Sequence, residues 1–221
     1  MTDARARIVG RIRRAVGRAG PPDAAAVEAA AAALLADPSR TQPALRRQDP
    51  IEEFKAKVTS ERLAATIEEI DSVADAPAAI RRYLEAEGAA PSLALAPDPS
   101  LEALDWSGLD VHRALDPNEG VAVSRAEWGI AETGSLVLLS RPEQPTLYAF
   151  LPLRHIVLAP RDGIVRHMED FWREFRESGR PQPRNINFVT GVSGTADIES
   201  KLVRGAHGPK RLHILLTAAA N

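Results

Sequence analysis

An alternation of helix and strand patterns from residue 50 onward limits most strongly how this chain folds. Apolar residues recur at helical spacing in two segments, and two compact apolar runs typical of buried strands follow them in turn. The order is helix, strand, helix, strand over 50–60, 62–70, 76–88 and 91–97. Strands that alternate with helices are typical of a parallel or mixed sheet covered by helices. The sequence therefore predicts an α/β fold.

The C-terminal half continues this pattern. Two strand-like runs joined by a turn-rich centre are predicted in 120–140, and a third buried strand in 154–160. Segment 163–178 has one apolar helical face that consists of Ile164, Met168, Phe171, Trp172 and Phe175.

The last part of the chain has a strand, helix, strand pattern. We predict a strand at 186–191, a short helix at 195–205 and a final strand at 213–218. A right-handed crossover would place these two strands parallel.

Two helices precede the α/β pattern. Segment 3–20 is a basic amphipathic helix, whose arginines could meet an acidic partner chain, anionic lipid or solvent. Asp23 is the predicted N-cap of a second helix that ends at Ala36. We therefore predict an N-terminal helical extension and linker over 1–49 and an α/β domain over 50–221.

Composition excludes several classes of function. A formal net charge of -2 provides no basic field for a nucleic acid, so we expect no nucleic-acid partner. The chain has no cysteine, so a thiolate-bound iron–sulfur cluster would have to belong to a partner protein. The apolar run at 24–36 is too short to span a bilayer, and we expect a cytoplasmic protein.

Neither a metal centre nor a serine hydrolase is predicted. The five histidines show none of the close pair spacings that are typical of a zinc site. The chain has no Gly-x-Ser-x-Gly motif, which disfavours a hydrolase triad.

The first candidate site is the glycine-rich turn at 189–199. After Gly191, Ser193 and Thr195 precede the predicted helix, whose N-terminal N–H groups attract phosphate or carboxylate groups. Asp197 falls in the first turn of that helix and would satisfy the same dipole from within the protein. Both a ligand-binding loop and a structural cap therefore stay open.

The second candidate lies between the strand-like runs. Glu132 is followed by Thr133, Gly134 and Ser135, which enter an apolar strand. A carboxylate at the edge of a sheet is suited to act as a general base or nucleophile. It is equally suited to accept backbone N–H groups and hold the turn.

The third candidate is His207 in the segment 204–209. Neighbouring glycines leave it room to approach a ligand, and the pKa of an ordinary histidine, about 6.5, suits proton transfer near neutral pH. Gly205 and Pro209 also fit a simple helix end, where a histidine stabilises the last carbonyls.

Taken together, the segments "GIAETGSL" and "TADIESKLVRGAHGP" resemble the bacterial lactate utilization protein C family, whose members carry the LUD domain. The motifs correspond to 129–136 and 195–209, and the opening "IVGRIRRAVGR" is similar to that family's first helix. The resemblance implies a three-layer α/β/α fold with a mostly parallel central sheet, similar to the ribose-phosphate isomerase and CoA-transferase group.

The resemblance also implies a role in the oxidation of L-lactate to pyruvate, together with iron–sulfur partner proteins and with no cofactor bound by this chain. Within that reading Glu132 and His207 are the candidate catalytic residues. Residues that would bind a small carboxylate such as lactate are Thr133, Gly134, Ser135, Gly191, Ser193, Thr195 and Asp197. Alternatives are an independent isomerase-like or CoA-transferase-like enzyme, or a non-catalytic assembly or regulatory subunit.

Overall fold

The structure is a computed structural model that describes residues 2–17, 23–37, 39, 42–196 and 202–218. It divides into two compact units, Met1–Pro43 and Ala44–Asn221, and each is described by itself. No helix within the described ranges is both long and apolar enough to cross a membrane.

The first unit contains two helices, α1 (Thr2–Ala15) and α2 (Ala24–Ala36). The carboxylate of Asp23 accepts a hydrogen bond from the backbone N–H of Ala25 at 3.3 Å. This contact satisfies an N–H group that has no partner within the helix. The predicted N-cap is therefore confirmed.

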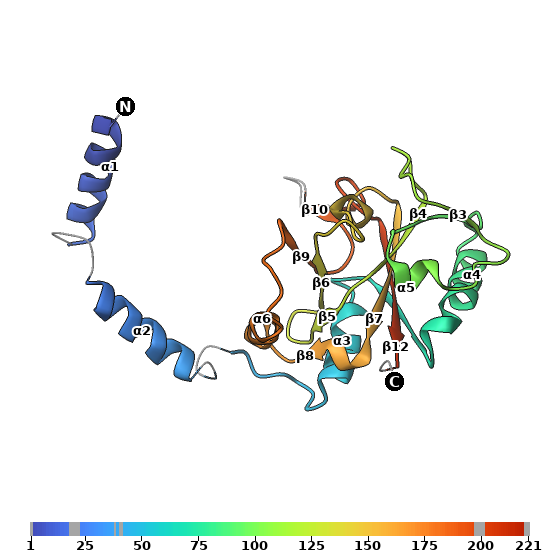
Figure 1. Ribbon diagram of the computed structural model, residues 1–221, viewed down its shortest axis with the longest axis horizontal. Helices are drawn as coiled ribbons and strands as arrows, with labels where there is room; N and C mark the ends of the chain where they lie inside the picture. Colours follow the sequence, from blue (N-terminus) through green and yellow to red (C-terminus); the bar gives the residue numbers. More distant parts are fainter. Residues whose placement is uncertain (1, 18–22, 38, 40–41, 197–201, 219–221) are drawn as a thin grey trace. The chain divides into compact units, whose positions relative to one another are not determined.

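The second unit combines helices and strands (Figure 1). Its helices are α3 (Pro50–Val58), η2 (Val73–Asp75), α4 (Ala76–Ala86), α5 (Pro99–Glu102), η3 (Thr146–Ala149), η4 (Arg161–Gly163) and α6 (Met168–Glu177). Its strands are β1 (Thr66–Ile70), β2 (Ser92–Leu95), β3 (Asp110–His112), β4 (Val121–Arg125), β5 (Trp128–Ile130), β6 (Ser135–Leu139), β7 (Arg154–Pro160), β8 (Ile164–Val165), β9 (Ile186–Val189), β10 (Gly194–Ala196), β11 (Leu202–Arg204) and β12 (Arg211–Thr217).

A six-stranded sheet forms the centre of this unit, with the strand order β1-β12-β7-β4-β2-β3. All five neighbouring pairs are parallel. Side chains of the central strand β7 alternate between two cores. Ile156 and Leu158 pack into the core beneath α4, while Val157 and Ala159 pack on the opposite face with α3. Helices therefore cover both faces, and the predicted α/β/α fold with a mostly parallel sheet is confirmed.

A second, four-stranded sheet with the order β8-β5-β6-β9 packs beside the first. Its strand β6 is buried on both faces: Leu136 and Leu138 join the core shared with β7, while Val137 and Leu139 face α6. Figure 1 shows α6 and α4 at opposite sides of this unit. The segment 120–140 holds three strands, where the sequence indicated two strand-like runs.

The apolar helical face predicted from Ile164 onward begins later than expected. Ile164 lies in the short strand β8, which pairs with β5, and α6 starts at Met168. Phe171 and Phe175 are buried against Trp128, which confirms that these aromatic side chains belong to a core.

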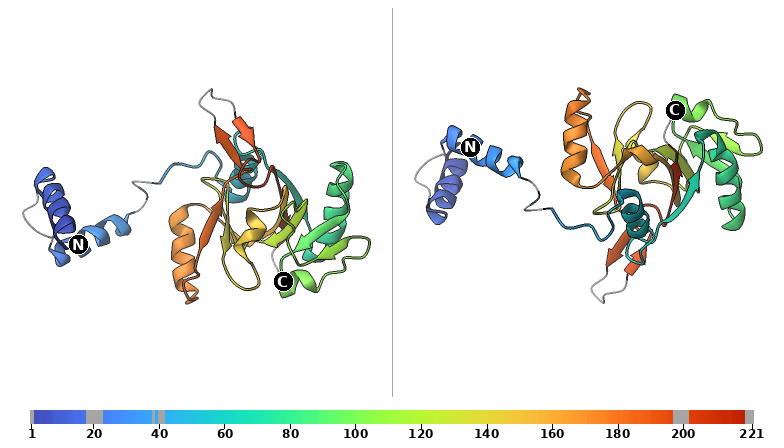
Figure 2. Two further views of the ribbon diagram at one scale, coloured as in Figure 1. Left: turned by 90° about the horizontal axis from the view of Figure 1, so that it is seen from above. Right: turned by 90° about the horizontal axis from the view of Figure 1, so that it is seen from below.

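The helix predicted at 195–205 is wrong in the described part of that segment. β10 and β11 form an antiparallel pair instead, and they project from the body of the unit (Figure 2). Thr195 lies directly opposite Val203, and both side chains are β-branched, which favours a strand. Gly205 follows a strand with φ +83, so it is not the end of a helix.

The two final strands, β9 and β12, do not form the parallel pair that the crossover rule predicted. β9 pairs antiparallel with β6 in the second sheet, whereas β12 lies parallel between β1 and β7 in the first. The rule applies to strands joined by a crossover within one sheet. The β10–β11 pair between them leaves the chain free to pass from one sheet to the other.

Two histidines of the main sheet are buried. Burial lowers the pKa of His155 to about 3. It lowers the pKa of His213 to about 4, against the opposing effect of the Glu68 carboxylate. His213 lies 2.8 Å from the Thr66 hydroxyl through Nδ1, and its ring stacks on Tyr83 with the ring centroids 4.0 Å apart. Both imidazoles are therefore neutral in the folded protein near pH 7.

Acid is expected to destabilise the protein through these two side chains. Below about pH 6.5 these histidines bind protons in the unfolded chain. In the folded chain they stay neutral until the pH approaches the lowered pKa values, so the free energy of unfolding decreases as the pH falls from about 6.5 toward those values. Each histidine contributes up to about 1.4 kcal/mol per pH unit. Urea unfolding measured between pH 7 and pH 4.5 gives the free energy of unfolding at each pH. Its slope against pH should be smaller for His213→Gln than for the parent. An unchanged slope would contradict the buried neutral state.

Candidate functional site

The predicted residue Glu132 lies at a corner between the second sheet and α6. One carboxylate oxygen, Oε2, is 2.7 Å from Nδ1 of His167, and the other, Oε1, accepts a hydrogen bond from the backbone N–H of Met168 at 3.2 Å. Both side chains are nearly buried, with exposed fractions of 10% and 13%. A negative charge at a helix N-terminus is stabilising. The contacts therefore show Glu132 in the helix-capping role, and its catalytic role stays a prediction.

A chain of hydroxyl groups begins at the residue that follows Glu132 in the sequence. The Ser135 oxygen is 2.7 Å from the hydroxyl of Thr133 and 2.6 Å from that of Thr190 at the end of β9. Gly134 turns the chain between them with φ +70, a conformation that favours glycine. The structure thus brings Thr133, Gly134 and Ser135 together with the start of the predicted turn at 191.

A structural requirement explains the glycine at position 191. Gly191 has φ +78, and a Cβ atom there would lie 2.5 Å from the backbone oxygen of Leu63. The next N–H group, of Val192, donates to the same oxygen at 3.0 Å. Ser193 then donates its N–H to the carbonyl of Pro209 at 2.9 Å, so this turn packs against two other segments of the chain.

The remaining predicted residues lie elsewhere. Thr195 on β10 and His207 are exposed, and Asp197 lies outside the described residues. Among the described contacts none joins Glu132 to His207. The described residues therefore show no direct contact between the two predicted catalytic residues.

The capping role of Glu132 predicts a loss of stability on substitution. Glu132→Ala removes two contacts of a nearly buried carboxylate and should lower the free energy of unfolding by about 2 kcal/mol. Thermal and urea unfolding would measure this loss. The matched control is Glu85→Ala, which removes an exposed carboxylate from α4. Equal stability of the two variants would contradict the capping role.

A cleft with charged walls lies at the carboxyl ends of β2 and β4. It has a volume of about 480 Å³ and opens to solvent. The residues that line it are Asp98, Pro99, Ser100, Arg125, Glu127, Arg141, Glu143 and Arg180. After β2 the chain adds β3 on one side of that strand and then β4 on the other. Ligands of open α/β sheets bind at such a switch point, outside the carboxyl ends of the strands.

Arg125 differs from the other two arginines of this cleft, because it has no ion-pair partner among the described residues. It ends β4, is half-buried, and donates a hydrogen bond from one terminal nitrogen to the hydroxyl of Ser100 at 3.0 Å. That hydroxyl donates in turn to Oδ1 of Asp98 at 2.6 Å. Among the described residues Arg125 has no carboxylate partner within ion-pair distance, so its other N–H groups are available to an anion.

Arg141 holds the opposite wall of the cleft. It donates to Glu127 at 2.5 Å and lies 3.6 Å from Oδ2 of Asp98, which is nearly buried. Glu127 also pairs with Arg180, whose guanidinium lies over the Trp128 ring, 5.4 Å from its centroid. These ion pairs fix the side chains of four separate segments at one place.

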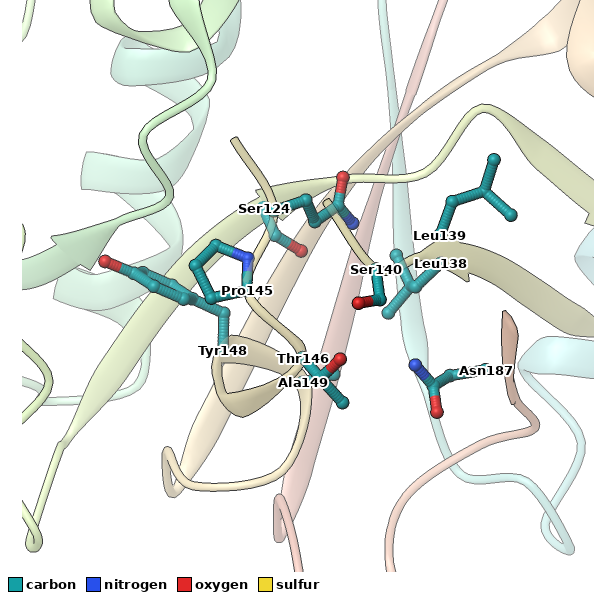
Figure 3. A pocket seen from close by; sticks show the side chains of 10 residues that line it. Ser124, Leu138, Leu139, Ser140, Pro145, Thr146, Tyr148, Ala149 and Asn187 are labelled. Carbon is teal, nitrogen blue, oxygen red and sulfur yellow. The ribbon is translucent and has the colours of Figure 1, made fainter. Parts of the chain in front are cut away.

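A smaller hollow of about 10 Å³ lies between residues of β4, β6, η3 and β9 (Figure 3). Polar groups of Ser124, Ser140 and Asn187 surround it from three different segments. The Ser124 hydroxyl lies 2.8 Å from Nε2 of His155, and both residues are buried. This volume is below that of typical ligand pockets, and we assign the Ser124–His155 pair to the core.

Sequence reasoning did not find the cleft. None of the predicted site residues lines the cleft or the smaller hollow. The available signal was Asp98, which directly follows the predicted strand 91–97, and Arg125, which lies within the predicted run 120–140, because the carboxyl ends of parallel strands meet at one edge.

Comparison with known families bears on the part of the chain that contains most of this cleft. Residues 118–217 match the LUD domain. This match, with the relatives described next, confirms the predicted family resemblance. The matched LUD residues include Arg125, Glu127, Arg141 and Arg180 of the cleft and Glu132 of the predicted site.

Curated relatives of this chain are named lactate utilization protein C. Lactate utilization protein C of Geobacillus thermodenitrificans (strain NG80-2) is 40% identical over 112 residues, which cover 49% of this chain and 46% of the relative. Lactate utilization protein C of Bacillus subtilis (strain 168) is 34% identical over 112 residues, with the same two shares. The matched region thus spans about half the length of these relatives.

A solved structure supports the fold of the unit that contains the matched residues 118–217. A DUF162 family protein from Deinococcus radiodurans superposes with a TM-score of 0.54 and 22% sequence identity. The alignment covers 79% of this chain and 99% of that protein. At this level of identity the similarity shows the fold alone.

Proposed function

We propose that this protein takes part in lactate utilization and binds a small 2-hydroxy or 2-oxo carboxylate, L-lactate or pyruvate, in the cleft at the carboxyl ends of β2 and β4. The names of its LUD relatives support the pathway. The half-buried Arg125, whose one hydrogen-bond partner among the described residues is a neutral hydroxyl, supports the ligand class and carries the proposal.

The cleft residues match such a ligand group by group. A guanidinium binds a carboxylate through two parallel charge-assisted hydrogen bonds, and Arg125 keeps donors available for them. The Ser100 hydroxyl and the Asp98 carboxylate lie next to this guanidinium and suit the 2-hydroxyl group of lactate. The ion pair of Arg141 and Glu127 holds the opposite wall of the cleft in place before the ligand arrives.

In this proposal the chain is one cytoplasmic subunit of a system that oxidises L-lactate to pyruvate. The reaction removes two electrons and two protons from lactate. Iron–sulfur partner proteins would receive the electrons, because these 221 residues contain no cysteine to ligate a cluster. This chain would bind no cofactor of its own. A proton-transfer role of Glu132 and His207, the candidate catalytic residues of the sequence, would require a site other than this cleft, because neither residue lines it.

Titration calorimetry with L-lactate and with pyruvate tests the ligand. Arg125→Met should weaken binding at least about tenfold, because it removes a charge-assisted contact without opening a large cavity. Arg173→Met is the matched control, since Arg173 is exposed on α6 and pairs with Asp170. Equal binding by both variants would exclude the cleft as the carboxylate site.

The pathway is tested in the cell. Purification of the native protein should recover cysteine-rich iron–sulfur proteins with it, and deletion of its gene should impair growth on lactate. A free monomer together with unchanged growth would reject the lactate system. Such a result would favour an independent isomerase-like or CoA-transferase-like enzyme, or an assembly subunit of another system.

A further inference from the structure

A second hollow, larger and less polar, adjoins the carboxylate cleft. It has a volume of about 550 Å³, opens to solvent and lies between the end of β6, the C-terminal part of α6 and the segment 180–184. Arg141 and Arg180 line both the cleft and this hollow. The two spaces are therefore neighbours that share two guanidinium groups.

The walls of this hollow combine flat apolar surfaces with positive charge. Leu139, Phe175 and three prolines, Pro142, Pro181 and Pro183, supply the apolar part. Three guanidinium groups, of Arg141, Arg180 and Arg184, supply the polar part. None of the residues that line it, all of them described, carries a carboxylate. The neighbouring cleft differs, because three carboxylates line it beside its three arginines.

Arg184 adds a cation that the fold leaves unused. It is exposed, and among the described residues no carboxylate lies within ion-pair distance of it. Arg141 and Arg180 pair with Glu127 on the cleft side, but each guanidinium has five N–H donors, so both retain donors for the hollow.

We propose that this hollow binds a nucleotide, with its flat ring against the apolar wall and its phosphate groups among the three arginines. Arginine is the side chain best suited to phosphate, which it binds through two N–H groups at once. Three cations match a multiply charged phosphate group better than the single charge of a fatty acid. The volume is sufficient for a ligand of this size.

Titration of the full chain with three probes tests this proposal. The probes are ADP, inorganic pyrophosphate, which lacks the ring, and decanoate, which has an apolar chain and one charge. ADP should bind at least about tenfold more tightly than either of the others, because it alone uses both the wall and the arginines. Pyrophosphate binding equal to that of ADP, tighter binding of decanoate, or no ADP binding would each overturn the proposal.

Substitution locates the site. Arg184→Ala should weaken ADP binding about tenfold, whereas Arg173→Ala on the exposed face of α6 should leave it unchanged. Lactate binding should not change in Arg184→Ala, because Arg184 does not line the cleft. Equal ADP binding by the two variants would reject this hollow, whatever the outcome for lactate.

Discussion

Burial of β6 on both faces is the constraint on which the rest of the larger unit depends. Its alternate side chains contribute to two different cores, one shared with the parallel sheet and one with α6. A strand with two apolar faces cannot lie at a solvent-exposed surface without a large cost in hydrophobic free energy. The second sheet is therefore held between the first sheet and α6, and the turns at both ends of β6 are fixed with it. One end carries Glu132 and its hydroxyl neighbours, and the other carries Arg141 of the cleft.

Local pattern predicted the regular part of this fold and failed where long-range pairing decides the structure. The helix and strand patterns from residue 50 to 97 and the buried strand β7 follow from apolar spacing. The segment around Thr195 and Val203 has apolar residues that fit a helix or a strand equally well, and the contact between two β-branched residues resolves the choice. A sequence pattern contains no information about that contact.

The candidate site shows the same division. Glu132, Thr133 and Ser135 attract attention because they are adjacent in sequence, and the structure does place them at one corner. The cleft is assembled from Asp98, Arg125 and Arg141, which lie on three segments. Asp98 and Arg125 meet because the parallel strands β2 and β4 end at one edge, whereas Arg141 follows β6 of the second sheet. Residues that share a short motif are easily found by inspection, whereas residues that share an edge require the strand order.

The two arginines common to the cleft and the neighbouring hollow have a thermodynamic consequence. An anion that binds on one side withdraws N–H donors and positive charge from the other, so anionic ligands of the two spaces oppose each other. Linkage makes this antagonism reciprocal: each ligand weakens the other by the same factor. Arg141 and Arg180 would thus make the occupancy of one space report on the concentration of the other ligand, without any movement of the backbone.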